Sequence, residues 1–202
     1  MPTSRSYQDP CGIARALDVV GERWALLVVR ELLLGGRRFS DLRRALPRSS
    51  SNMLADRLRE LERHGVVHRP HPPAYELTAW GRDLEPIVLS LGDWALRHVP
   101  PPSGPLHLSP VSILLFLRGA VRPGPPLTVR LDLDDTTWTL RVTPSSVVVT
   151  PGPPPSCDVS LTTTPLQLND LAADRFGPSL DHALATGAAA VSGDRDRLRT
   201  LL

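Results

Sequence analysis

The stretch that decides the fold runs over residues 37–69 and reads RRFSDLRRALPRSSSNMLADRLRELERHGVVHR. Leu54, Leu58 and Leu61 recur within it at the spacing of one face of an α-helix. The serines before them can cap the start of that helix, and His64–Gly65 is a typical end. The stripe predicts an amphipathic helix that buries its leucines and presents the opposite face to solvent.

The segments around this helix follow the order of a winged helix. Ser40 is expected to cap a short helix that ends before Pro47, and Thr78 to cap the last one. Two β-rich segments would form a hairpin with a proline-rich tip. The expected helices are 13–20, 24–34, 41–46, 51–64 and 79–94, and the hairpin strands are 66–69 and 75–77 with a tip at 70–74.

The charge of the chain is concentrated in this region. The protein has 202 residues and a formal net charge of only +2, which does not by itself indicate a nucleic-acid binder. Residues 37–69 nevertheless contain nine arginines and four acidic residues. A basic segment that includes an amphipathic helix is the electrostatic pattern expected of a DNA-binding element. The chain has arginine but no lysine, and arginine suits bidentate contacts to phosphate and guanine.

A proline-rich segment divides the chain. Pro100, Pro101, Pro102 and Pro105 remove backbone donors and favour extended backbone, which is typical of a stiff linker. Residues 1–105 carry 15 Arg against 12 acids, whereas residues 106–202 carry 8 against 9. We therefore predict a DNA-binding domain over 1–98, a linker over 99–109 and a second domain over 110–202.

The second domain is predicted to be α+β, with helices packed on an antiparallel sheet. Alternating apolar residues mark strands at 127–133 and 137–142, and Asp134–Asp135 between them is typical of a turn. Helices are expected where apolar residues follow Ser109–Pro110 and Thr164–Pro165. The remaining expected elements are strands at 147–149, 159–161 and 189–191 and helices at 179–186 and 194–202.

Over residues 11–95 the chain resembles the HxlR family of bacterial transcription regulators. The similar strings are CGIARALDVVGERWALLVVRELLLGGRRFSDLRRALP, SSNMLADRLRELERHGVV and YELTAWGRDLEPIVLSLGDW. The resemblance implies a winged-helix homodimer that binds double-stranded DNA at a palindromic operator, with repression as the usual outcome. It also implies a dimer interface made by the first and last helices, here Ile13, Leu17, Leu84, Ile87, Leu91 and Trp94.

Polar and basic side chains around the central helix are the candidate DNA contacts. Side chains at a helix N-terminus and on its outer face can reach phosphates and base edges in a major groove. Arg57 lies at the flank of the leucine stripe, so it could instead bond to Glu60 or Glu31. The candidates are Arg38, Ser40, Arg43, Arg48, Ser50, Ser51, Asn52, Arg57 and Arg59, with His68 and Arg69 in the wing.

Cys11 supports an alternative mode of control. Several relatives in the HxlR family sense oxidants through a cysteine at this place, and Cys11 stands at an expected helix start near Arg15. A helix N-terminus and a nearby positive charge favour the reactive thiolate. The alternative interpretation is a small residue at the dimer interface.

The C-terminal half resembles the type-two sterol carrier protein family. The similar string is CDVSLTTTPLQLNDLAADRFGPSLDHALATGAAAVSGDRDRLRTLL, residues 157–202. The resemblance implies an interior that holds an apolar or lipid-like effector; alternatively, the interior is filled and the domain supports dimerisation. Candidate lining residues, chosen for apolarity, are Leu114, Leu117, Leu131, Trp138, Leu140, Phe176 and Leu180.

Several other classes of protein are not expected. No apolar run is long enough to span a membrane, residues 1–12 lack the core of a secretory signal, and two distant cysteines form no disulfide framework. We expect a cytoplasmic protein. Because no phosphate loop, metal-ligand spacing or catalytic triad is recognisable, we expect no enzyme activity, cofactor or metal. A competing class is a lipid carrier or scaffold whose winged helix contacts only protein.

Overall fold

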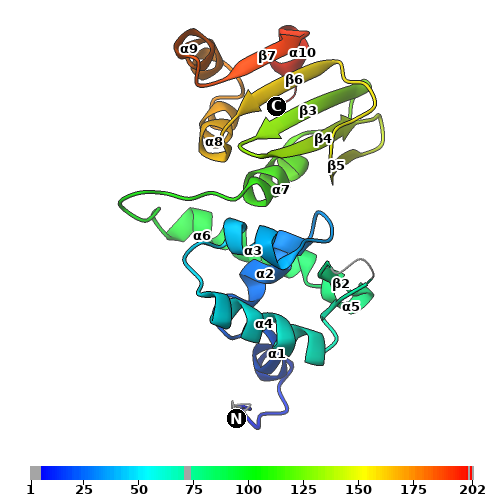
Figure 1. Ribbon diagram of the computed structural model, residues 1–202, viewed down its shortest axis with the longest axis vertical. Helices are drawn as coiled ribbons and strands as arrows, with labels where there is room; N and C mark the ends of the chain where they lie inside the picture. The colour runs from blue at the N-terminus through cyan, green and yellow to red at the C-terminus, as the bar shows by residue number, and fades with distance from the viewer. Residues whose placement is uncertain (1–5, 71–73, 200, 202) are drawn as a thin grey trace. The chain divides into compact units, whose positions relative to one another are not determined.

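The chain forms two compact units in the computed structural model, which describes residues 6–70, 74–199 and 201 (Figure 1). The N-terminal unit is Met1–Pro101 and the C-terminal unit is Pro102–Leu202. The division falls in the proline-rich segment, where missing backbone donors prevent regular structure from continuing. Each unit buries a core of its own.

The N-terminal unit is a winged helix, as the sequence predicts. Its hairpin pairs Val67 with Leu77, and backbone hydrogen bonds of 2.9 and 2.8 Å between Arg37 and Tyr75 extend the pairing. The elements in chain order are α1 Gly12–Val20, α2 Ala25–Leu32, α3 Phe39–Ala45, α4 Ser51–Arg63, β1 Val67–His68, β2 Glu76–Leu77, α5 Ala79–Arg82 and α6 Glu85–His98.

The prediction of a single helix over 79–94 is wrong, because the structure has two helices, α5 and α6. The chain turns at Asp83 and Leu84, and Pro86 opens α6 in its first turn, where a missing N–H costs nothing. Gly81 holds α5 tightly against the wing, since a Cβ there would lie 2.1 Å from the Val66 carbonyl oxygen. The close approach anchors α5, and the chain leaves in a new direction as α6.

The start of α3 also differs from the prediction. Ser40 lies inside the helix, and Arg38 occupies the N-cap position. The Asp41 carboxylate accepts a hydrogen bond of 3.2 Å from the Arg38 amide, which stabilises a start two residues earlier. An acidic side chain in the first turn also suits the positive end of the helix.

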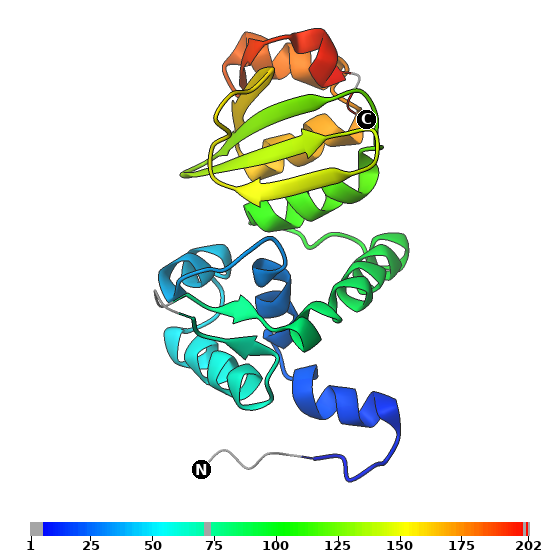
Figure 2. The same ribbon diagram turned by 90° about the vertical axis from the view of Figure 1, so that its right-hand side faces the viewer.

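The C-terminal unit packs helices against one face of a five-stranded sheet, with α7 and α8 behind the sheet in Figure 2. Strand order is β5-β4-β3-β6-β7. Along β3, Leu127, Val129, Leu131 and Leu133 are buried, while the residues between them face outward. The elements are α7 Pro110–Ala120, β3 Leu127–Leu133, β4 Thr136–Val142, β5 Val147–Pro151, β6 Val159–Thr163, α8 Pro165–Ala173, α9 Pro178–Thr186, β7 Ala190–Gly193 and α10 Arg195–Arg199.

The sheet is not purely antiparallel, so that part of the prediction is wrong. Strands β3 and β6 run parallel, with Val129 opposite Val159. Residues 152–158 read GPPPSCD, and their three consecutive prolines do not make a tight hairpin. They carry the chain across to the free edge of β3, where Asp158 exchanges hydrogen bonds with Thr128 at 2.7 and 2.9 Å.

Candidate nucleic-acid interface

The leucine stripe of α4 fixes which side of the helix faces solvent. Leu54, Leu58 and Leu61 are each 0% exposed and belong to the core that α2 completes. Because these leucines lock the rotation of the helix, the opposite side is exposed and carries Asn52 and Arg59. A helix with one buried stripe and one polar outer face has the form needed to enter a major groove.

The turn between α3 and α4 is held rigid from inside. The Arg43 guanidinium donates to the backbone oxygen and, at 3.3 Å, to the hydroxyl of Ser49. The buried Ser49 hydroxyl in turn donates to the Leu46 carbonyl at 2.8 Å. Arg43 is half-buried, so its side chain stabilises the turn from inside and does not lie on the outer surface.

The N-terminus of α4 combines a cap with exposed polar groups. The Ser50 hydroxyl accepts a hydrogen bond of 3.1 Å from the Met53 amide, and the first turn contains no acidic residue. The partial positive charge at this end of the helix is therefore not neutralised within the turn. Arg48, Ser51 and Asn52 are exposed beside it, an arrangement suited to a phosphate.

We expect the Ser50→Ala variant to lower the free energy of unfolding by about 1 kcal/mol, because it removes the cap of α4. Urea denaturation measures this change. Ser51→Ala is the matched control, since Ser51 is exposed at the next position and does not act as the cap. Equal stability of the Ser50 variant and the wild type would show that the cap contributes nothing.

Arg57 differs from the other candidate contacts because it is buried. Its guanidinium pairs with Glu60 one turn along α4 and lies 3.6 Å from Glu22, in the connection between α1 and α2. The predicted Glu60 partner is confirmed, while Glu31 pairs with Arg30 at 2.7 Å. The structure thus places Arg57 in a buried position that links α4 to the preceding helices, rather than on the exposed side of α4.

Arg59 lies on the exposed side of α4. It pairs with Asp56 at 2.5 Å, and both side chains are open to water. An exposed pair of this kind contributes about 0–1 kcal/mol, so a phosphate can replace the carboxylate at little cost. Arg38 and Ser40, at the start of α3, are also exposed.

The wing is tied to the end of α4 through Arg69. Its guanidinium lies 3.3 Å from Glu62 and 5.0 Å above the Tyr75 ring, and the hydrogen bond to Glu62 raises the pKa of Arg69. His68 and Arg69 are both exposed. Part of the expected hairpin tip, residues 71–73, lies outside the described residues.

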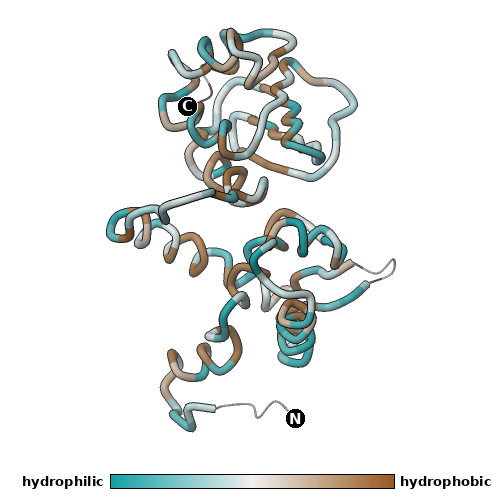
Figure 3. The backbone as a smooth tube through the Cα atoms, turned by 60° about the vertical axis from the view of Figure 1, so that its left-hand side comes forward, coloured by the Kyte–Doolittle hydropathy of each residue, from teal (hydrophilic) through white to brown (hydrophobic). Residues whose placement is uncertain are grey.

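An apolar surface lies on the helices at the two ends of the N-terminal unit. Ile13 and Leu17 are exposed on α1, and Ile87, Leu91 and Trp94 are exposed on α6, whose described residues are all at least partly accessible. Leu84 is half-buried beside them. Figure 3 shows apolar residues recurring along α6. A groove of about 440 Å³ runs between α1 and α5–α6 and is lined by both.

Cys11 is exposed at the N-cap position of α1. The backbone amides of Ile13 and Ala14 hold the pKa of its thiol below the ordinary value. Cys157 is also exposed and lies in the C-terminal unit. The structure therefore gives Cys11 the access and the helix-start position that a reactive thiol requires.

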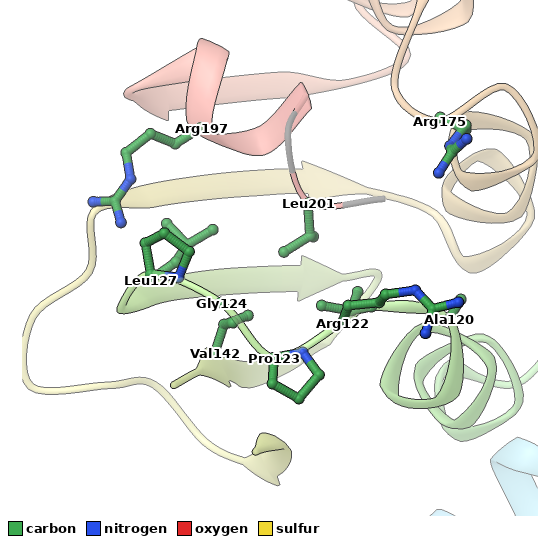
Figure 4. A pocket seen from close by; sticks show the side chains of 11 residues that line it. Ala120, Arg122, Pro123, Gly124, Leu127, Val142, Arg175, Arg197 and Leu201 are labelled. Carbon is green, nitrogen blue, oxygen red and sulfur yellow. The ribbon is translucent and has the colours of Figure 1, made fainter. Parts of the chain in front are cut away.

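The seven apolar residues proposed to line a pocket lie in the core of the C-terminal unit. All are buried, and they fill the space between the sheet and its helices. A cavity of about 410 Å³ lies elsewhere in this unit, near the end of α7 (Figure 4). None of the seven residues lines it. Apolarity alone does not distinguish a side chain that fills a core from one that borders an open space.

Sequence reasoning missed several residues that line the two cavities. Trp80 and Arg15 border the groove in the N-terminal unit, and Arg122, Arg175 and Arg197 border the cavity in the C-terminal unit. Arg122 is 53 residues from Arg175, and Arg175 is 22 residues from Arg197, so no sequence pattern brings the three arginines together. Arg15 stands out in the sequence for its place near Cys11, one turn along α1, but not as part of a groove.

Other kinds of site are not found in the part of the chain that the structure describes. No three His, Cys, Asp or Glu side chains there gather closely enough to hold a metal ion. Nor does any described helix have the length and apolarity needed to cross a bilayer.

Comparisons with known proteins place the N-terminal unit among bacterial regulators. The family model for the HxlR-like helix-turn-helix matches residues 19–103. The HTH-type transcriptional regulator YdeP of Bacillus subtilis strain 168 is 37% identical over 94 residues, which are 44% of this chain and 73% of that protein. YvaP of the same strain, also an HTH-type transcriptional regulator, is 41% identical over 93 residues, 43% of this chain and 86% of its own length.

Solved structures include a similar protein. The redox regulator HypR in its oxidised form is 39% identical, with a TM-score of 0.42. The match covers 45% of this chain and 100% of the HypR chain.

Proposed function

The chain belongs to the HxlR-like helix-turn-helix family, and from this premise we propose that it is a homodimeric, sequence-specific repressor that inserts α4 into the major groove of an operator. The observation that carries the proposal is the geometry of α4. Its buried leucine stripe leaves an outer face of polar and basic residues, and its N-terminus is capped and free of acidic groups.

The contacts to DNA divide by chemistry. The exposed Ser51 and Asn52 at the start of α4 are in position to reach base edges, where an asparagine amide suits adenine. Arg48 and Arg59 would bind phosphates on either side of the groove. His68 and Arg69 of the wing would contact the backbone or the minor groove beside it. In this scheme Arg43 and Arg57 position the turn and the helix without touching DNA.

Dimerisation would use the apolar face of α1 and α6. Exposed apolar side chains at Ile87, Leu91 and Trp94 recur every three or four residues, so they form a stripe along α6. Contiguous apolar surfaces of this kind mark protein interfaces. A twofold dimer would present two copies of α4, which accounts for a palindromic operator.

The proposal is tested on DNA from upstream of the protein's own gene. We expect specific binding that weakens as salt rises, because phosphate contacts release counterions. Arg59→Ala should weaken binding by about 1–3 kcal/mol, roughly 5- to 150-fold. Fluorescence anisotropy against a labelled duplex measures both effects.

Arg141→Ala is the matched control, since it removes another exposed arginine, one from the C-terminal unit. Its affinity for the operator should equal that of the wild type. Absence of any sequence-specific binding, or an Arg59 variant that binds as tightly as the wild type, would contradict the regulator proposal. That result would favour a carrier or scaffold whose winged helix contacts protein.

The C-terminal unit would serve as the sensor. It is a separate compact unit with a cavity of about 410 Å³, within the size range of small-molecule sites. An apolar effector bound there would change operator affinity only if it binds the DNA-competent and incompetent dimers with different affinity. Release of the operator when the effector binds is the expected direction.

Cys11 favours a second candidate function, regulation by thiol oxidation. Because the amides of Ile13 and Ala14 lower the pKa of the thiol, more thiolate is present at neutral pH than in an ordinary cysteine. Cys11 also lies next to Gly12, which lines the groove between α1 and α6. A modification at Cys11 would therefore alter the proposed dimer face.

We expect the rate of Cys11 alkylation by iodoacetamide to reach half its maximum at a lower pH than for a cysteine in a short peptide. The lowered pKa makes the thiolate the dominant form at a lower pH. The measurement uses Cys157→Ser, so that only Cys11 reacts. A midpoint equal to that of the peptide would contradict the prediction, and operator release by oxidant in a Cys11→Ser variant would exclude Cys11 as the switch.

A further inference from the structure

Arg57 of α4 is a buried guanidinium with one donor left over. Its Nη1 pairs with Glu60, and its Nη2 lies 3.6 Å from Glu22. The third nitrogen, Nε, is buried, and no residue in the described part of the chain accepts a hydrogen bond from it. A buried donor without a partner is unusual in a folded protein and needs an explanation.

The place of the unused donor points to Glu22. Nε and Nη2 lie on the same side of a guanidinium, and one carboxylate can accept from both through two parallel hydrogen bonds. At 3.6 Å from Nη2, the Glu22 carboxylate is on this side but too distant for a hydrogen bond. An approach of roughly 0.8 Å would bring its oxygen within bonding range. The Glu22 side chain is 62% exposed, so it has room to turn.

The backbone at Glu22 is supported by the end of α1. The connection between α1 and α2 begins at Gly21, whose amide donates to the Leu17 carbonyl at 2.8 Å. A Cβ at Gly21 would lie 2.5 Å from the same oxygen, so the connection is packed directly against the helix. The position of Glu22 is therefore set by the position of α1.

The other end of the connection is held by Trp24. Its φ of 79° lies in the left-handed region, which a bulky residue adopts only where the surrounding structure enforces it. The Trp24 side chain packs against the core of the N-terminal unit, and the Arg23 guanidinium lies 5.3 Å from the centre of its ring. With both ends fixed, the connection offers Arg57 a rigid partner.

We propose that Glu22 is a positioning residue for α4: its carboxylate accepts from Nη2 and Nε of Arg57 together and fixes the angle of α4 when this helix enters the major groove. The inference deepens the proposed function and rests on it for one point, that α4 is the helix that reads DNA. Base contacts depend on the angle of the helix, so Glu22 would act on specificity through Arg57 without touching DNA.

The first test compares operator binding with binding to a scrambled duplex for Glu22→Gln. Loss of a negative charge alone should tighten binding to any DNA. We expect the opposite for the operator, with affinity about threefold or more weaker, while affinity for the scrambled duplex is unchanged or tighter. Arg57→Lys should show the same selective loss, because lysine keeps the charge but cannot present two parallel donors.

The second test needs no DNA. Hydrogen exchange of the α4 amides should be about twofold or more faster in Glu22→Gln than in the wild type, because the helix has lost a support. Exchange of the β3 and β4 amides, in the other unit, should be unchanged. Asp93→Asn is the matched control for both tests, since it removes the charge of another exposed carboxylate, one on α6. It should show neither faster α4 exchange nor weaker operator binding.

Unchanged α4 exchange in Glu22→Gln would overturn the proposal whether or not the protein binds an operator. Equal changes in operator and scrambled binding, or wild-type operator affinity in Arg57→Lys, would also overturn it. A wild type that binds no specific DNA, together with faster α4 exchange in Glu22→Gln, would refute the regulator proposal and leave Glu22 only as a support of the fold.

Discussion

Replacing Leu91 with Asp is expected to convert the proposed dimer into monomers and to weaken operator binding by at least about 100-fold. Leu91 lies in the middle of the apolar stripe of α6 and is 48% exposed in the isolated chain. A partner would cover it, and a carboxylate buried there without a partner charge is strongly unfavourable. Sedimentation velocity measures the dimer, and anisotropy measures operator affinity.

The loss of DNA affinity follows from the loss of the dimer. A dimer holds its second recognition helix close to the second half-site, so the two contacts reinforce each other. A monomer binds DNA through one recognition helix only, so it loses the added affinity of the second contact. The Leu91 variant should therefore retain the folded winged helix, and its circular dichroism should match that of the wild type.

Leu96→Asp is the matched control on the same helix. At 100° per residue, Leu96 lies roughly 170° around α6 from the centre of the Ile87–Leu91–Trp94 stripe. It is 78% exposed. The substitution introduces the same charge and the same change in helix propensity, yet we expect a dimer. Dimerisation by the Leu91 variant would place the interface on another surface.

The elements that could be predicted from the sequence are those fixed by local rules. The leucine spacing of α4 and a serine cap at its start depend on residues within one or two turns of each other, and both are confirmed, with the cap at Ser50. The wing follows in the same way from short alternating segments between turn residues. Where two local signals compete, as Ser40 and Asp41 do at the start of α3, sequence alone gives the wrong boundary.

Features that depend on distant residues could not be predicted. Glu22 approaches Arg57 across 35 positions of the chain, and the packing of α1, α2 and α4 brings them together. The parallel pairing of β3 and β6 depends on which edge a proline-rich connection reaches. The arginine-lined cavity requires three segments of the C-terminal unit to meet. The spacing of residues along the sequence does not indicate these long-range contacts.

Phe176→Ala is expected to lower the stability of the C-terminal unit by about 3–5 kcal/mol, the range for removing a large buried aromatic side chain. Phe176 is 0% exposed, and its amide donates to the Leu171 carbonyl at 2.7 Å, closing the end of α8. Because the chain has two units, hydrogen exchange of the β3 and β4 amides is the measurement, since these strands report on this unit alone.

Phe116→Ala provides the control within the same unit. Phe116 is 48% exposed on α7, so the same substitution removes much less buried surface. We expect its effect on β3 and β4 exchange to be less than half that of the Phe176 variant. Equal effects would mean that Phe176 does not anchor the core.

The size of the Phe176 effect bears on the cavity as well. Burial of the ring contributes about 1.5–3 kcal/mol, which offsets much of the roughly 2–4 kcal/mol that the left-handed backbone at Arg175 and Phe176 costs. The ring therefore holds the strained turn that carries Arg175 to the cavity wall.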